Sequence, residues 1–300
     1  MTAQRTKLLI LGRSGQLAKA LAAQIEAIPE FEAKVLGRPE LDVTDSAALE
    51  RAIAQSSPDI LINATAYTAV DRAEDEPDLA MAVNADALGV MGRAAAEAGC
   101  PVIHVSTDYV FDGEGERPYR PEDPTGPRSV YGASKLAGER ALAAAQPQHI
   151  ILRTAWLYSA EGQNFMNTML RLAETRDGLA VVEDQRGCPT LAEDLAEAIL
   201  TICGHLAAGK PPVWGVFHYS GAGETTWFGF AKAIFEEAAK RGLPHAQVTP
   251  TTTAAFGAKA PRPAYSVLDG ASLAQAYGIT QKEWRQRLSE TLDSRSAASR

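Results

Sequence analysis

The feature that most constrains the fold is a glycine-rich turn near the N-terminus. Residues 7–11 (KLLIL) form a short apolar run that predicts a buried parallel strand, and it continues directly into Gly12-Arg13-Ser14-Gly15-Gln16-Leu17-Ala18. Apolar residues then recur at helical spacing, so the glycines lie at a strand-to-helix turn. In such a turn Gly12 allows a tight bend, Gly15 lets backbone amides approach a pyrophosphate, and Ala18 permits close helix packing. The turn predicts a dinucleotide site; a βα turn without a ligand is the alternative.

Strand and helix patterns alternate through the first half of the chain. Further strands are predicted at residues 33–37, 59–63, 101–105 and 148–153, with helices at 45–55, 77–98 and 129–145. This alternation predicts an α/β fold, a Rossmann-like doubly wound parallel sheet with a smaller substrate-binding lobe. We expect residues 1–153 to form the NAD(P)-binding domain, with a returning helix at about 191–207. Residues 154–190 and 208–300 are expected to form mainly the substrate-binding lobe.

The end of the second predicted strand indicates the cofactor. NAD-specific sites usually place an acidic residue there, but this chain has Leu36-Gly37-Arg38. Arg38 and Arg13 therefore favour the 2′-phosphate of NADPH, with NADH possible; two solvated arginines are the alternative. Asp42 and Val43 follow at a position suited to the adenine edge, and the small-residue loop Ala64-Thr65-Ala66-Tyr67-Thr68 can lie along a cofactor.

Tyr131 and Lys135 are the candidate catalytic pair. They are four residues apart in the predicted helix 129–145, so both lie on one face, about one turn apart. A neighbouring ammonium would lower the pKa of the tyrosine from its usual value of about 10. This spacing also occurs by chance on solvated helices. The strand at 101–105, however, brings Ser106, Thr107 and Asp108 to the sheet edge that carries the glycine turn.

Composition and charge exclude several other classes of protein. The chain has 300 residues, and its formal net charge of −8 argues against nucleic acid or an anionic membrane as partner. The apolar run near the N-terminus is too short for a signal sequence or membrane span, so we expect a cytoplasmic protein. Three cysteines without a C-x-x-C pair predict neither a disulfide framework nor a zinc site. His104 is expected to pack within its strand, and Asn84 to be either a buried anchor or exposed.

Several motifs together resemble one enzyme superfamily. They are the glycine turn, the run from Asn63 to Asp71 (NATAYTAVD), the run from Ser106 to Phe111 (STDYVF), and Tyr131-x-x-x-Lys135. This set resembles the extended short-chain dehydrogenase/reductase superfamily. Within it, the chain is similar to the branch that reduces 4-keto groups of dTDP-linked deoxy sugars. The narrower similarity depends on Gly15-Gln16-Leu17, Gly113, Arg153-Thr154-Ala155-Trp156-Leu157-Tyr158, Asp184-Gln185-x-Gly187-x-Pro189-Thr190 and Arg262-Pro263.

The resemblance implies a role for each matching position. Tyr131 would donate a proton to the C4 carbonyl oxygen, Lys135 would bind the nicotinamide ribose, and Thr107 would hydrogen-bond the reacting oxygen. Substrate would be bound by Thr107, Asp108, Trp156 and Arg262. The cofactor would contact Gly12, Arg13, Ser14, Gly15, Gln16, Leu17, Arg38, Asp42, Val43, Ala64, Ala66, Tyr67, Thr68, Val105, Tyr131 and Lys135. Arg262 suits the pyrophosphate of a nucleotide sugar, although a surface arginine between prolines is the alternative.

The same resemblance leaves other functions open. A related nucleotide-sugar epimerase, a reductase of another deoxy sugar and a non-catalytic regulatory subunit are the alternatives. Dehydratases of the superfamily tend to have Asp-Glu after the threonine, whereas Asp108 here precedes Tyr109. Some relatives form dimers linked by Mg²⁺ through an acid on the first helix, but this helix has no carboxylate before Glu26. We therefore predict no metal ligands, leave Mg²⁺ uncertain, and expect a monomer or homodimer that binds a dTDP-sugar.

Overall fold

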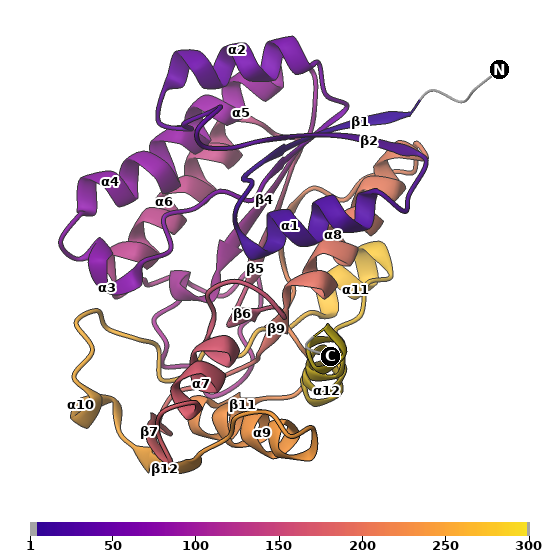
Figure 1. Ribbon diagram of the computed structural model, residues 1–300. Coiled ribbons are helices and arrows are strands. Elements are labelled where there is room, and N and C mark those ends of the chain that lie inside the picture. Colours follow the sequence, from indigo (N-terminus) through magenta and orange to yellow (C-terminus); the bar gives the residue numbers. More distant parts are fainter. Residues whose placement is uncertain (1–4, 299–300) are drawn as a thin grey trace.

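A six-stranded parallel sheet forms the centre of the computed structural model, which describes residues 5–298 (Figure 1). The strand order is β10-β5-β4-β3-β1-β2, and every pairing between neighbours is parallel. The strands are β1 (Thr6–Leu11), β2 (Phe31–Leu36), β3 (Ile60–Asn63), β4 (Val102–Thr107), β5 (His149–Thr154) and β10 (Gly215–His218). The predicted doubly wound α/β fold is confirmed.

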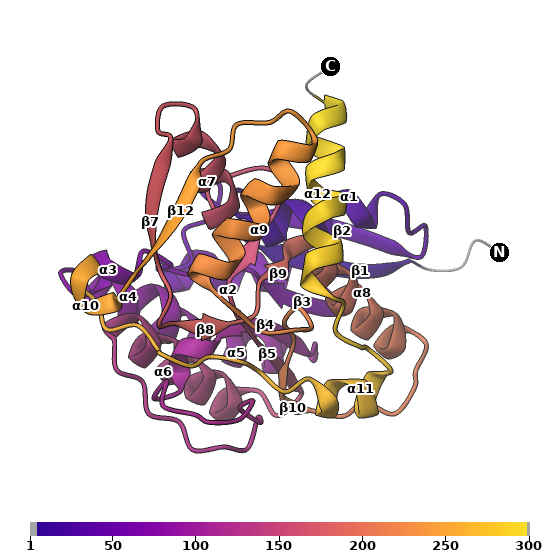
Figure 2. The ribbon, with the colours of Figure 1, turned by 90° about the horizontal axis from the view of Figure 1, so that it is seen from below.

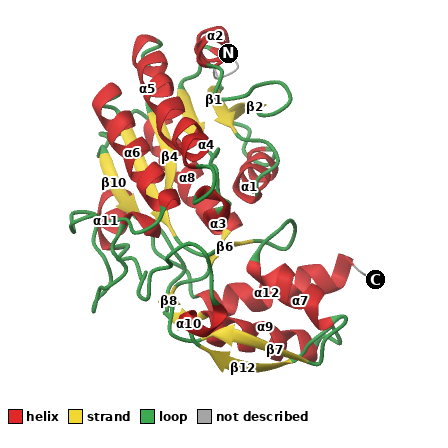
Figure 3. Ribbon diagram, turned by 90° about the vertical axis from the view of Figure 1, so that its left-hand side faces the viewer, coloured by secondary structure: helices red, strands yellow, loops and turns green. Residues whose placement is uncertain are grey.

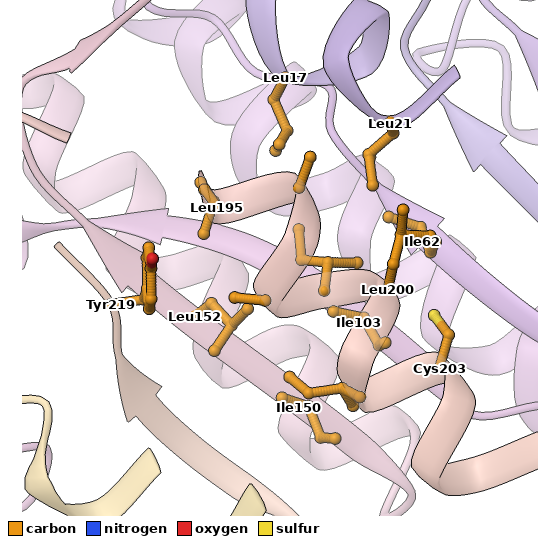
Figure 4. Packing of buried hydrophobic residues seen from close by; sticks show 14 of the residues in the cluster. Leu17, Leu21, Ile62, Ile103, Ile150, Leu152, Leu195, Leu200, Cys203 and Tyr219 are labelled. Atoms are coloured by element: carbon orange, nitrogen blue, oxygen red, sulfur yellow. The ribbon is translucent and has the colours of Figure 1, made fainter. Parts of the chain in front are cut away.

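Helices cover both faces of this sheet because its strands are apolar on both sides. Leu8 and Ile10 of β1 pack with α1 (Gln16–Ile25), α8 (Ala192–Ala207) and α11 (Ala271–Tyr277). Figure 4 shows Leu17 and Leu195 from two of these helices above Ile103 and Leu152 of the sheet. On the opposite face Leu9 and Leu11 pack with residues of α2 (Ser46–Ser56), α5 (Ala87–Glu97) and α6 (Val130–Ala145).

The helix predicted over residues 77–98 is divided into three parts. It begins as α4 (Pro77–Met81), continues as the π-helical turn η1 (Ala82–Asp86), and ends as α5. Asn84 lies in η1 and is fully buried, which settles the alternatives for this residue. Its side chain bonds the backbone of Tyr67 and the hydroxyl of Ser134, so the π turn ties a loop to α6.

A smaller lobe lies at the carboxyl ends of the strands (Figure 3). Its core contains Met166, Phe230, Ile234, Trp284 and Leu288. The helices α9 (Trp227–Lys240) and α12 (Trp284–Ala298) run beside each other (Figure 2). The remaining elements are α3 (Val70–Ala73), η2 (Asp108–Val110), β6 (Leu157–Tyr158), α7 (Phe165–Ala173), β7 (Gly178–Val182), β8 (Arg186–Gly187), β9 (Thr190–Leu191), β11 (Thr225–Thr226), α9 (Trp227–Lys240), β12 (Gln247–Thr251), α10 (Thr253–Phe256) and α12 (Trp284–Ala298).

Part of the stretch assigned mainly to the substrate lobe lies in the sheet domain. β10 pairs with β5 at the edge of the sheet. Leu273 and Tyr277 of α11 pack on the sheet face that α1 and α8 also cover. Residues 1–4 of the expected cofactor domain fall outside the described part of the chain. Among the helices that are described, none has the combination of length and apolar character needed to cross a membrane.

The sheet order creates a switch point between β1 and β3. From β1 the chain moves outward to β2, and then returns to place β3 on the other side of β1. Loops that follow β1 and β3 therefore separate at their carboxyl ends, where open α/β sheets bind ligands. A Cβ added to Gly12, after β1, would lie 3.0 Å from the carbonyl oxygen of Ala64, after β3. The two loops thus approach each other closely at this point.

A substitution at Gly138 tests whether α6 has to pack closely against η1. A Cβ at this position would lie 1.9 Å from the carbonyl oxygen of Asn84. We expect Gly138→Ala to lower the free energy of unfolding by about 1–3 kcal/mol, measured by urea denaturation. Gly204→Ala on α8 is the matched control, because no atom lies within 4 Å of its added methyl. That control should raise stability by about 0.4–1 kcal/mol, and equal losses in both variants would contradict the packing argument.

Candidate active site

The candidate catalytic side chains meet where β4 ends and α6 begins. The hydroxyl of Ser129 accepts a hydrogen bond from the amide of Gly132 at 3.1 Å, which caps α6 at its N-terminus. Tyr131 and Lys135 follow on the buried face of the helix, 9% and 1% exposed, and Thr107 ends β4 at 6%. Thr107, Tyr131 and Lys135 are therefore buried close to one another, as the sequence predicted.

Burial, rather than the neighbouring lysine, dominates the electrostatics of Tyr131. Burial raises the pKa of Tyr131 to about 12; the Thr107 hydroxyl opposes this shift and the Asp108 carboxylate adds to it. Lys135 is not among the causes of this shift, and its hydrogen bonds go to β4; that it lowers the pKa of Tyr131 stays a prediction. A phenol with this pKa keeps its proton at neutral pH.

Lys135 is held by two groups of β4. Its Nζ donates to the carbonyl oxygen of Val105 at 2.8 Å and lies 3.1 Å from Nε2 of His104. Burial lowers the pKa of Lys135 to about 8, although Glu139 one turn along α6 acts in the opposite direction. Val105 therefore contributes its backbone to the lysine, and His104 does more than pack within its strand.

Asp108 is a second unusual acid in the cluster. Its Oδ1 accepts a hydrogen bond from the Thr107 hydroxyl at 2.8 Å, and the residue is 2% exposed. Burial raises the pKa of Asp108 to about 6, and the Thr107 and Ser266 hydroxyls oppose this shift. A carboxyl group with this pKa carries a proton in an appreciable fraction of molecules at pH 6 to 7.

The glycine turn has the backbone geometry of an anion site. Gly12 has φ +113°, a conformation that side chains disfavour, and an added Cβ at Gly15 would meet no atom within 4 Å. Helix α1 begins at Gln16 with no side-chain cap and no acid in its first turn, so its free amides can face an anion. Ser14 is exposed at the turn.

Two residues of this turn do not face a ligand with their side chains. Leu17 is buried in the core between the sheet and α8. Gln16 accepts hydrogen bonds from the Ser159 hydroxyl at 2.9 Å and the Asn164 amide at 2.8 Å, so it links the turn to the lobe. The buried Leu17 side chain is therefore unavailable for the predicted cofactor contact, and the Gln16 side chain is bound to the lobe through its oxygen.

The two arginines proposed for NADPH lie beside the glycine turn and the end of β2. A Cβ at Gly37 would lie 2.9 Å from the Cβ of Arg13, so the two loops are adjacent. Arg38 is exposed, and Arg13 forms an exposed ion pair with Glu40. Glu40 is an acid near this position that the sequence analysis did not consider.

The remaining predicted cofactor residues divide into exposed and buried ones. Asp42 is exposed and accepts hydrogen bonds from the Thr44 amide at 3.0 Å and hydroxyl at 2.8 Å. Val43 packs against Val83 and Ala87. In the loop after β3, Ala64, Ala66 and Tyr67 are partly buried and Thr68 is exposed.

Trp156 stacks on a second tryptophan, Trp227, the first residue of α9. The rings of Trp156 and Trp227 are 3.6 Å apart at their centroids and nearly parallel, at 10°. An added Cβ at Gly187 would lie 2.6 Å from Trp156, so glycine there leaves room for the indole. Trp227 was not among the predicted site residues, and local spacing could not show that it lies against Trp156.

Arg262 is held in place by an acid from the sheet domain. Its Nη1 and Nη2 donate to the two carboxylate oxygens of Asp71 at 2.9 and 2.8 Å. The guanidinium of Arg262 is the main cause that lowers the pKa of Asp71 to about 2, so the carboxylate stays charged through the physiological range. Asp71 also accepts a hydrogen bond from the amide of Ala260 at 3.0 Å. Asp71 is the last residue of the run from Asn63 to Asp71, but the sequence did not indicate that it would pair with Arg262.

A buried ion pair fixes α6 against β5. Arg153 donates to both carboxylate oxygens of Glu139 at 3.0 and 2.7 Å, and both side chains are 5% exposed. The guanidinium also lies 5.0 Å from the centroid of the Phe111 ring. Within residues 5–298 there is no cluster of three or more histidine, cysteine or acidic side chains suited to a metal ion.

Comparison with known proteins identifies close relatives. Residues 6–296 match the family model described as the RmlD substrate binding domain. The chain is 46% identical over 284 residues to a dTDP-4-dehydrorhamnose reductase of Sinorhizobium fredii, covering 93% of this chain and 94% of that protein. It is 42% identical to one of Streptomyces griseus, covering 96% and 93%. The structure of a Bacillus anthracis dTDP-4-dehydrorhamnose reductase in complex with NADP has a TM-score of 0.90 at 34% identity, covering 97% and 100%.

The buried ion pair gives a stability prediction. Arg153→Met would leave the Glu139 carboxylate buried without a cation, so we expect the free energy of unfolding to fall by about 3–5 kcal/mol in urea denaturation. Arg153→Met combined with Glu139→Met removes both charges and should recover most of the loss. If the double variant is as unstable as the single one, packing of Arg153 rather than the unpaired charge accounts for the effect.

Proposed function

The chain belongs to the RmlD substrate binding domain family, and we propose that it is a dTDP-4-dehydrorhamnose reductase. It reduces the C4 keto group of dTDP-4-dehydro-L-rhamnose to a hydroxyl and so yields dTDP-L-rhamnose. The observation that carries this proposal is the buried Thr107, Tyr131 and Lys135 cluster, next to a glycine turn, in a chain closely similar to named reductases.

The residues at the switch point fit a nicotinamide cofactor. Gly15 leaves open space beside the uncapped N-terminus of α1, whose first amides can face a pyrophosphate, while Arg13 and Arg38 are close to the end of β2, where a 2′-phosphate would need cations. NADPH is therefore the proposed cofactor, and the relative from Bacillus anthracis was solved with NADP. The ion pair of Arg13 with Glu40 would have to open or adjust for that role. Bound NADPH supplies the hydride for the reduction.

Tyr131 supplies the proton that completes the reduction. Reduction of a ketone to an alcohol requires one proton on the carbonyl oxygen, and a phenol with a pKa of about 12 carries that proton at neutral pH. Thr107 lies at the same place and can hydrogen-bond the oxygen while its charge develops. Lys135, one turn along α6, would hold the ribose of the nicotinamide. Burial of the cluster excludes bulk water from the transfer.

The lobe supplies contacts for the rest of the substrate. Arg262 would bind the diphosphate through its planar guanidinium, which Asp71 orients by accepting from both Nη atoms. The stacked Trp156 and Trp227 offer an aromatic surface to the sugar or the base. Asp108, which is buried beside Thr107, would contact the sugar.

Three further properties belong to the proposal. The substrate is a dTDP-sugar rather than nucleic acid, the protein acts in the cytoplasm, and it works as a monomer or homodimer.

A coupled assay tests the activity. The dTDP-4-keto sugar is made in situ by the upstream dehydratase and epimerase, and oxidation of NADPH is followed by absorbance. We expect NADPH to be consumed only when this protein and both upstream enzymes are present. Tightly bound oxidised NAD with no net consumption would instead favour an epimerase. Cofactor binding without turnover of any dTDP-4-keto sugar would favour a regulatory subunit.

Tyr131→Phe tests the proton donor. We expect kcat to fall by about 10²–10⁴-fold because the reaction loses its positioned acid, while NADPH affinity measured by fluorescence titration stays near that of the natural protein. Tyr109→Phe is the matched control, since Tyr109 packs edge-on against Tyr131 with ring centroids 5.4 Å apart. The control should lose far less activity, and unchanged turnover in Tyr131→Phe would remove this residue from the mechanism.

A further inference from the structure

Trp156 has a backbone conformation that aromatic residues rarely adopt. Its φ is +47°, in the left-handed region that favours glycine, and Ser57 is the only other non-glycine residue with a positive φ among residues 5–298. Such a conformation costs free energy and persists only where the surrounding contacts hold it. Trp156 lies two positions after Thr154, the last residue of β5, which pairs in register with Thr107 of β4. The contacts that hold Trp156 therefore act next to the catalytic cluster.

The indole of Trp156 bridges two separate hydrophobic clusters. One cluster contains Val110 of η2 and Leu136 of α6, so it belongs to the packing of the catalytic helix. The other cluster is the core of the smaller lobe. Trp156 is partly buried and packs against both clusters. The ring thus joins the helix that carries Tyr131 to the smaller lobe.

Trp227 covers one face of this ring. The two indoles are nearly parallel, with 10° between their planes and 3.6 Å between their centroids. Trp227 is the first residue of α9, and it also packs against Phe165, the first residue of α7, with ring centroids 4.6 Å apart. The starts of two lobe helices therefore fix Trp227, and Trp227 fixes the plane of Trp156. A stacked ring has only its other face left for a ligand.

Two short strands place a glycine beside the same indole. β8 pairs with β11, and β11 ends directly before Trp227. In this register Gly187 of β8 lies opposite Thr225 of β11. An added Cβ at Gly187 would lie 2.6 Å from Cε2 and 2.8 Å from Cζ2 of Trp156. One strand pair therefore positions both the stacking partner of Trp156 and the glycine that leaves room for its ring.

The surroundings of Gly187 also show which part of a substrate Trp156 can reach. The added Cβ would lie 2.8 Å from the Ser266 hydroxyl as well, so Ser266 and Trp156 are neighbours. Burial raises the pKa of Asp108, and the hydroxyls of Thr107 and Ser266 both oppose this rise, so Ser266 also lies beside that carboxyl group. Trp156 is therefore close to the residues proposed to hold the reacting sugar. The base of a nucleotide sugar lies at the other end of the diphosphate.

From this geometry we infer that Trp227 is a positioning residue for the sugar of the substrate and acts through Trp156. Trp227 holds Trp156 in its left-handed backbone conformation and fixes the plane of its indole. The free face of Trp156 then forms one wall of the sugar site, next to Thr107 and Tyr131. The inference deepens the proposed function and rests on it, because the ligand has to be a dTDP-linked sugar.

A flat wall in a fixed plane sets the distance between the sugar and the proton donor. The C4 oxygen has to lie within hydrogen-bond reach of Tyr131 for the proton to move. In Trp227→Leu a branched side chain replaces the flat ring, so the indole of Trp156 is free to tilt and its backbone to relax. The nucleotide part of the ligand, which Arg262 would hold, does not depend on this stack.

Titration calorimetry with two ligands tests the inference. dTDP-L-rhamnose contains the sugar and dTDP lacks it, so the ratio of their dissociation constants isolates the contribution of the sugar site. For Trp227→Leu we expect the affinity for dTDP-L-rhamnose to fall about tenfold, because one aromatic pair is lost. The affinities for dTDP and for NADPH should stay unchanged. Trp227→Phe keeps a ring that can stack on Trp156 and should recover most of the loss.

Two further variants complete the test. Phe228→Leu is the matched control, because Phe228 is the next residue of α9 and packs against the same lobe core; it should leave the affinities for both ligands unchanged. Gly187→Ala disturbs the indole of Trp156 from another contact and leaves Trp227 in place. It should weaken the binding of dTDP-L-rhamnose and spare that of dTDP, and it keeps the test valid if Trp227→Leu does not fold.

Circular dichroism reports the stack without any ligand. Two stacked indoles give an exciton couplet in the far ultraviolet, which we expect in the natural protein and in Phe228→Leu but not in Trp227→Leu. If the natural protein binds both ligands and Trp227→Leu keeps the same ratio of affinities, the proposed function stands and the inference alone is overturned. If the natural protein binds neither ligand, the proposed function fails, and the inference fails with it.

Discussion

The active site depends on backbone-to-backbone contact along one helix. A Cβ at Gly132 would lie 2.2 Å from the carbonyl oxygen of Tyr109, and one at Gly138 would lie 1.9 Å from that of Asn84. Glycine at both positions lets α6 lie directly on η2 and η1. Because the helix lies this close, Tyr131 and Lys135 reach the end of β4 and become buried. A larger residue at either glycine would move both side chains together.

Burial then determines the chemistry of the cluster. It raises the pKa of Tyr131 and Asp108 and lowers that of Lys135, because burial disfavours the charged form of each group. A buried cluster of neutral donors and acceptors is stable only if every partner matches. Asn63 accepts from Thr65 through its side-chain oxygen, its amide nitrogen lies 3.0 Å from Nδ1 of His104, and Nε2 of the same ring lies 3.1 Å from Nζ of Lys135. Stability and reactivity in this part of the protein therefore have the same physical cause.

The two lobes are joined by contacts that also border the site. Gln16 of the glycine turn accepts hydrogen bonds from Ser159 and Asn164 of the lobe, and Asp71 of α3 holds Arg262 from the segment after α10. Each contact links a residue expected to bind cofactor or substrate to the opposite lobe. Closure of the lobes over a nucleotide sugar would act on these same hydrogen bonds.

The sequence by itself determined the parts of the protein that depend on local order. Apolar runs, the Gly12 turn and the spacing of Tyr131 and Lys135 predicted the parallel sheet and the catalytic helix, because each feature involves residues within about one turn or one strand. Tertiary structure alone decided the partners: His104 for Lys135, Trp227 for Trp156, Asp71 for Arg262, and β10 at the sheet edge beside β5. It also decided the pKa of Tyr131, since burial by residues far away in the chain raises it. Partner choice and desolvation depend on residues far apart in the chain, and local spacing contains no information about them.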